Sequence, residues 1–203
     1  MAVSNSIRFA SYNMHGFLQG NLYLKELRRD TDIIFLQEHW LYPSNLHLLH
    51  TISDDFVCFG SSAMTECISK RIMSGRPFGG VAILVGANVA KFCQLIHKSQ
   101  RFIIVRYSET LLVNVYMPCK SVVNYADIYC DTVNNISAII SCHVHASVVL
   151  GGDLNFDFNV GDIVRKTINS FFRQLSDRVQ IPSADRACVI IHVICYVVMK
   201  FLC

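Results

Sequence analysis

Two polar residues, Asp153 and Asn155, follow a strongly apolar stretch at positions 146–150 and a pair of glycines. If a strand continues to this point, residues two apart share one face, so the carboxylate and the amide point to the same side. The carboxylate could hold a nucleophilic water or take a proton, and the amide could hold a phosphoryl oxygen. The pattern predicts metal-assisted attack on a phosphate. The same letters are also ordinary turn chemistry after a strand, and this alternative stays open.

Three further polar residues, Asn13, Glu38 and Tyr116, stand at the ends of other apolar stretches. If these stretches are neighbouring strands, the three side chains converge with Asp153 and Asn155 on one edge of the fold. Glu38 supplies a hard oxygen ligand for Mg²⁺, which keeps several waters and takes only one or two carboxylates. The five residues therefore predict a magnesium site that handles phosphate. For Tyr116 the alternative is an aromatic side chain at a strand end with its hydroxyl in water.

Apolar periodicity indicates the strands and helices that must position these residues. Strands are expected at 7–12, 32–36, 55–60, 81–85, 92–96, 102–107, 111–116 and 146–150. Helices are expected at 22–29, 122–140 and 163–175, and the long one carries an apolar stripe that should cover a sheet. The four strands from 81 to 116 follow one another closely, which predicts an antiparallel meander. We expect an α/β (α+β) fold of two packed, mostly antiparallel sheets with helices outside.

Composition supports one domain with a large core. The chain has 203 residues, of which 16% are charged and 52% hydrophobic, and this predicts strands buried on both faces. The net charge of +3 permits a polyanionic partner without demanding one. Nine cysteines form no Cys-x-x-Cys pair, and the first 20 residues do not read as a secretory signal. We expect reduced thiols and a location in the nucleus or cytoplasm.

Five short blocks, in order, resemble the endonuclease/exonuclease/phosphatase superfamily, which includes pancreatic DNase, apurinic endonucleases and the endonuclease domains of LINE-type retrotransposons. They are Ser11-Tyr12-Asn13-Met14-His15-Gly16, Leu36-Gln37-Glu38-His39-Trp40, Gly79-Gly80-Val81-Ala82-Ile83-Leu84, Asn114-Val115-Tyr116-Met117-Pro118 and Gly151-Gly152-Asp153-Leu154-Asn155. The blocks span roughly residues 7 to 160. The spellings of the second and fourth blocks are most similar to the LINE-type branch.

The resemblance implies a four-layer sandwich, with helices outside two sheets, and a role for each residue of the site. Glu38 would bind Mg²⁺ (or Mn²⁺), with Asn13 beside the metal as a hydrogen-bonding group. Tyr116 would contact the scissile phosphate. Asp153 would position or activate the attacking water or serve the leaving group, and Asn155 would orient it. The implied partner is DNA, and nothing indicates an obligate protein partner.

A polar loop at 61–78 carries three cations that could contact DNA phosphates, Lys70, Arg71 and Arg76. The alternative is a basic loop that is merely solvated. Five of the histidines, by contrast, are not expected to bind metal, because zinc needs three or four ligands and no partner set is evident. These are His15, His39, His143, His145 and His192.

The chain departs from the family pattern in two places. His15 stands where apurinic endonucleases carry a second acidic residue, although LINE-type members often lack that acid. The family also closes with a Ser-Asp-His-like block, and no Asp-His pair occurs in this sequence. We therefore expect a domain over 1–182 that is incomplete at its C-terminus, followed by a foreign apolar tail over 183–203. The apolar run from 187 spans 17 residues, short of the ~20 that cross a bilayer, so we do not expect a membrane partner.

Three functions remain open on the sequence alone. The first is a Mg²⁺-dependent phosphodiester hydrolase, a DNA-nicking endonuclease domain of retrotransposon origin, whose activity is in question because the Asp-His block is missing. The second is a non-catalytic remnant that folds or binds nucleic acid without cutting it. The third is a phosphoesterase that acts on small molecules or lipids.

Overall fold

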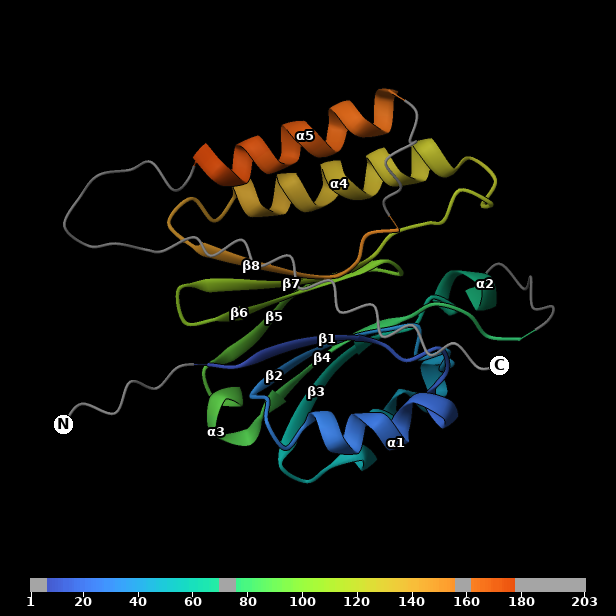
Figure 1. Cartoon of the computed structure of the whole chain (residues 1–203), viewed down its shortest axis with the longest axis vertical. Coiled ribbons are helices and arrows are strands. Elements are labelled where there is room, and N and C mark those ends of the chain that lie inside the picture. Colours follow the sequence, from blue (N-terminus) through green and yellow to red (C-terminus); the bar gives the residue numbers. More distant parts are fainter. Residues whose placement is uncertain (1–6, 70–75, 156–161, 178–203) are drawn as a thin grey trace.

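The computed structural model describes residues 7–69, 76–155 and 162–177 (Figure 1). Its strands are Phe9–Asn13 (β1), Ile33–Gln37 (β2), Phe56–Ser61 (β3), Val81–Gly86 (β4), Cys93–Lys98 (β5), Phe102–Tyr107 (β6), Thr110–Tyr116 (β7) and Ser147–Asp153 (β8). Its helices are Phe17–Leu27 (α1), Thr65–Ser69 (α2), Ala87–Ala90 (α3), Tyr125–Ser141 (α4) and Asp162–Asp177 (α5), with a 3₁₀ helix at Pro43–Ile52 (η1). The proposed boundary at 182/183 and the tail lie outside the described residues.

The strands form two four-stranded sheets. Sheet A has the order β1-β2-β4-β3, and sheet B has the order β5-β6-β7-β8. Each sheet contains one parallel pair, β1 with β2 and β7 with β8, while its other neighbours are antiparallel. The parallel pairs matter for function because parallel neighbours end at the same edge of a sheet.

Helices cover the outer face of each sheet (Figure 1). Helices α4 and α5 pack on sheet B, and α1 with η1 packs on sheet A. A third apolar cluster fills the layer between the two sheets. The expected four-layer sandwich of two mostly antiparallel sheets is confirmed.

Strand β2 shows why so few residues of this chain are charged. Ile33 and Phe35 pack between the sheets, whereas Ile34 and Leu36 face α1 and η1, and all four are fully buried. A strand buried on both faces reads as a continuous apolar run instead of an alternating one. The sequence therefore shows the strand clearly but hides which face each side chain takes.

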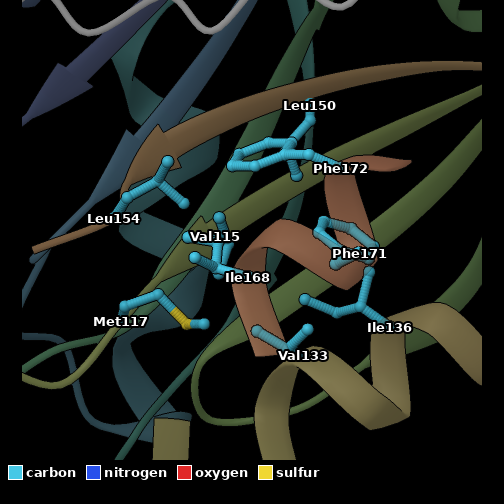
Figure 2. Close-up of a pocket in the computed structure, with 9 residues that line it drawn as sticks. All are labelled: Val115, Met117, Val133, Ile136, Leu150, Leu154, Ile168, Phe171 and Phe172. Atoms are coloured by element: carbon cyan, nitrogen blue, oxygen red, sulfur yellow. The ribbon is translucent and has the colours of Figure 1, made fainter. Parts of the chain in front are cut away.

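Helix α4 carries the expected apolar stripe, and its buried side chains face sheet B and α5. A small apolar cavity lies in this layer (Figure 2). It is lined by Val115, Met117, Val133, Ile136, Leu150, Leu154, Ile168, Phe171 and Phe172. Tyr116 stands between the lining residues Val115 and Met117 in the sequence, but it packs in the layer between the sheets. The cavity therefore does not belong to the polar strand ends.

Several expected boundaries are wrong. The first helix begins at Phe17 instead of Leu22, the loop at 61–78 contains α2, and β8 runs through both glycines to Asp153. The meander includes only β5, β6 and β7. Strand β4 pairs with β2 and β3 in sheet A, and the short helix α3 separates it from β5, the first strand of sheet B.

Among the described residues, no helix combines the length and the apolar character needed to cross a bilayer. The cysteines reported as free thiols are Cys58, Cys93, Cys119, Cys130 and Cys142. Burial raises the pKa of the Cys58 thiol to about 12, so this group stays protonated in the core.

Candidate active site

Four polar residues meet at one edge of the two sheets. Strand β1 ends at Asn13 and Glu38 directly follows β2, while β7 ends at Tyr116 and β8 at Asp153. Within each parallel pair the ends are in register, and β1 contacts β8 across the layer between the sheets. The strands are thus neighbours, which was the condition for their polar residues to converge. We call these four residues together with Asn155 the strand-end cluster.

Asn13 lies between the two carboxylates of the cluster. Its Nδ2 donates to Glu38 Oε1 at 2.7 Å and to Asp153 Oδ2 at 3.1 Å. Its Oδ1 accepts a hydrogen bond from the backbone N–H of His15 at 3.1 Å, which orients the amide with its nitrogen toward the acids. One side chain of sheet A therefore joins a carboxylate from each sheet.

Glu38 is held in place from several directions. Its backbone has a left-handed φ of 56°, and its N–H donates to Gly80 O at 2.9 Å. The indole Nε1 of Trp40 donates to Glu38 Oε2 at 3.2 Å, and the Tyr116 hydroxyl also forms a hydrogen bond with this carboxylate. The side chain is 14% exposed, so solvent and a ligand can still reach it. Non-glycine residues with positive φ are uncommon and cluster at functional sites, which fits a carboxylate fixed for binding.

The Tyr116 hydroxyl points into the cluster instead of standing free in water. Burial raises its pKa, and the charge of Glu38, the hydrogen bond to Glu38 and the charge of Asp153 raise the pKa further. The hydroxyl therefore stays protonated at neutral pH and can donate a hydrogen bond. A neutral donor beside two carboxylates is suited to contact a phosphoryl oxygen.

Asp153 uses its two oxygens differently. Oδ2 accepts from Asn13, while Oδ1 accepts from the backbone N–H of Asn155 at 3.0 Å. Asn155 lies beyond the strand with a φ of 43°, and its Nδ2 donates to Met117 O at 2.7 Å. The expectation that strand alternation aligns the two side chains is therefore wrong, because a turn brings Asn155 back toward β7. Asp153 and Asn155 therefore form a turn and belong to the polar cluster at the same time.

A buried polar network lies directly behind the cluster, and the sequence interpretation missed it. Gln37 Nε2 donates to Asn114 Oδ1 at 2.7 Å and to Ser11 Oγ at 3.2 Å. Asn114 Nδ2 donates to two backbone carbonyl groups of sheet A, Leu36 O and Ala82 O, both at 2.8 Å. Polar residues within otherwise apolar strands could have indicated this network, because buried polar groups need hydrogen-bond partners.

Of the three cations predicted to contact DNA, Arg76 is exposed, whereas Lys70 and Arg71 lie outside the described residues. His39 is fully buried, where its Nδ1 accepts from Leu41 N–H and its Nε2 pairs with Ser61 O, each at 3.0 Å. Its ring therefore has a structural role. Trp40, which holds Glu38, was part of a matching block but received no role from the sequence.

The donor set fits a hard divalent cation better than a softer one. Across the described residues, no group of three or more His, Cys, Asp or Glu side chains could hold a metal ion. Mg²⁺ keeps several waters and binds through one or two carboxylates, and the cluster brings two carboxylates to the same amide. Glu38 and Asp153 could supply these oxygens. Asn13 presents its nitrogen to both acids, so in this orientation it positions the carboxylates instead of binding the metal.

Comparisons with known proteins support the fold. No family model and no curated protein sequence matches this chain. The 3′ phosphatase NExo from Neisseria, solved with a product DNA hairpin, has a TM-score of 0.58 at 16% identity, over 85% of this chain and 71% of that one. An AP endonuclease from Archaeoglobus fulgidus has a TM-score of 0.60 at 12% identity, over 83% and 70%. The catalytic domain of human Nocturnin, with a bound sulfate anion, has a TM-score of 0.53 at 16% identity, over 81% and 68%.

Proposed function

We propose that this chain is a phosphodiester hydrolase of the endonuclease/exonuclease/phosphatase type that uses Mg²⁺ (or Mn²⁺) at the strand-end cluster. The observation that carries the proposal is the Asn13 amide, which joins Glu38 of one sheet to Asp153 of the other at the shared edge of both sheets. The fold shared with NExo and the AP endonuclease supports it, because those two proteins are named for acting on phosphate esters and DNA. DNA is accordingly the proposed substrate.

The cluster offers a distinct task for each group. Glu38 would hold the cation, which when bound polarises a phosphoryl oxygen and offsets developing negative charge. Asp153 would orient a water and accept its proton, since Oδ2 faces the cluster while Oδ1 is held by the turn. Tyr116 would donate its hydroxyl proton in a hydrogen bond to a non-bridging oxygen. Asn13 would keep the two carboxylates at a fixed separation.

Within this class we propose a DNA-nicking domain of LINE-type retrotransposon origin. The support is the spelling of the second and fourth blocks in the sequence, which surround Glu38 and Tyr116. Nicking of one strand in duplex DNA would distinguish this function from terminal phosphate removal.

The direct test is relaxation of supercoiled plasmid by the full chain with Mg²⁺. Glu38→Gln and Asp153→Asn should each reduce nicking by at least about 10²-fold, because each removes a charge aimed at the reacting phosphate. Glu109→Gln is the matched control, since Glu109 directly precedes β7 at the end opposite Tyr116 and its carboxylate forms a surface ion pair with Arg106. Nicking that survives both cluster substitutions would overturn the assignment of the site.

A non-catalytic role is the second candidate, favoured by the absence of an Asp-His pair from the sequence. It predicts that the chain retains DNA on a gel without Mg²⁺-dependent cleavage. Hydrolysis of soluble phosphoesters with plasmid left intact would instead indicate a small-molecule phosphoesterase. Each result is read from the same purified protein.

A further inference from the structure

An aromatic pair borders the strand-end cluster, and beyond the hydrogen bond from Trp40 to Glu38 its rings take no part in the chemistry proposed above. The rings of His15 and Trp40 lie with centroids 4.9 Å apart and planes tilted by 54°. The His15 side chain is 74% exposed. His15 comes two residues after Asn13, and Trp40 two residues after Glu38, so both belong to the segments that leave the parallel strands of sheet A.

The indole of Trp40 is fixed on two sides. A Cβ placed on Gly16 would lie 2.8 Å from Trp40 Cε3, so only a glycine there leaves room for the ring. The indole Nε1 is tied to Glu38 Oε2. His15 and Trp40 both hold left-handed backbone angles, with φ of 50° and 54°. The two rings are therefore held in a fixed arrangement. The imidazole is exposed to solvent and is not packed in the core.

The pair also lies against the group proposed to hold the cation. His15 Nδ1 is 3.7 Å from Glu38 Oε2. A phosphate located at Glu38 and Asp153 would place its own nucleotide, or the adjoining one, beside this surface. Proteins bind unpaired nucleobases by stacking them on aromatic side chains, histidine and tryptophan included, with little dependence on base sequence.

We propose that the His15–Trp40 pair is a stacking platform for one unpaired nucleobase next to the phosphate held at the strand-end cluster. The proposal rests on the proposed function only in that a nucleic-acid phosphate occupies the cluster. It assigns the substrate class more narrowly, to single-stranded DNA or to a duplex in which one base has left the stack at this point. A base held within a duplex is already stacked and cannot lie on the platform without leaving its neighbours.

The test uses the single tryptophan of the chain as its probe. Emission from Trp40 is followed while the full-length protein, with Mg²⁺ present, is titrated with a short single-stranded oligonucleotide whose phosphorothioate linkages slow cleavage. A second strand of equal length and charge has abasic sugars throughout. The base-containing strand should change Trp40 emission and bind about fivefold or more tightly than the abasic strand, since stacking on one aromatic group favours binding to that extent.

Two substitutions of His15 separate stacking from charge. His15→Ala should remove most of the difference between the two strands, whereas His15→Phe should retain it, because phenylalanine keeps an aromatic face without the imidazole nitrogens. His47→Ala is the matched control, since His47 is an exposed histidine of η1 that hydrogen-bonds to Ser44 O. Circular dichroism of each variant checks that the fold is kept.

The outcomes separate this inference from the function on which it rests. Equal affinity for both strands, no measurable binding of either, or an unchanged ratio in His15→Ala would overturn the platform, even if Glu38-dependent nicking is present. A base-dependent affinity that His15→Ala abolishes supports the platform, even if plasmid is never nicked and the hydrolase assignment fails.

Discussion

Gln37 and Asn114 meet between the two sheets, with Gln37 Nε2 2.7 Å from Asn114 Oδ1 and both side chains buried. Asn114 belongs to sheet B, yet its amide nitrogen donates to two backbone carbonyl groups of sheet A. Gln37 immediately precedes Glu38, and Asn114 lies two residues before Tyr116. The contact between Gln37 and Asn114 therefore sets how far the two halves of the strand-end cluster stand apart.

Asn114→Leu should lower the free energy of unfolding by about 2–4 kcal/mol, because it removes one hydrogen-bond partner of Gln37 and one donor to each of two carbonyl groups in the core. Gln37→Leu should also destabilise the protein. The double variant should lose less stability than the two single variants added together. In the double variant neither amide is left in the core without the other. Urea denaturation of all four proteins measures the coupling. Strictly additive losses would contradict this account of the pair.

Much of the architecture could be predicted from the sequence, because apolar runs such as the one at 32–36 survive as buried strands. The meeting of polar residues at one edge could be predicted as well, since Asn13, Glu38, Tyr116 and Asp153 each stand where an apolar run ends. Which strand joins which sheet could not, because strands buried on both faces carry no alternation. The predicted meander of four strands from 81 to 116 was therefore wrong, because its first strand belongs to the other sheet.

The inner contacts of the site were also beyond the sequence. Glu38 and Trp40 both have positive φ angles, and their side chains form a hydrogen bond. Both features arise from the tertiary packing of the two sheets, not from local propensity. Asn155 shows the same limit. The sequence around Asn155 fits both a turn and a catalytic pair. Only the position of β7 shows that the turn directs the Asn155 amide to Met117 O.

Tyr116→Phe should preserve the fold and reduce phosphodiester cleavage by about 10²-fold, the effect typical of removing one donor to a developing oxyanion. The ring remains packed between the sheets while the hydroxyl proton beside Glu38 is lost. Single-turnover plasmid nicking measures the rate. Tyr107→Phe is the control, because Tyr107 closes β6 at the far edge of sheet B. Equal rates in Tyr116→Phe and the parent would exclude a catalytic hydroxyl.

Gly152→Ala should lower the free energy of unfolding by about 3 kcal/mol or more, because the residue combines strained backbone with a steric clash. Gly152 has a φ of +133°, and an added Cβ would lie 2.0 Å from the backbone oxygen of Val115. The clash would part β8 from β7 one residue before Asp153, so cleavage should fall as well. Gly86→Ala is the comparison, since its Cβ would meet the end of the Asn88 side chain at 3.0 Å and the backbone oxygen of Asp32 only at 3.4 Å. Thermal melts that shift equally for both variants would contradict the assignment.

Stability should fall in mild acid because of His39. Burial lowers the pKa of His39 to about 4 in the folded protein, from an ordinary value of 6.5. Between these values the unfolded chain binds a proton that the folded protein does not, so stability is full above about pH 6.5 and is lost as the pH falls toward 4. The loss is at most about 3 kcal/mol. Urea denaturation at pH 7.5 and pH 5 should show a smaller difference in His39→Gln than in the parent, and equal differences would show that another group controls the acid sensitivity.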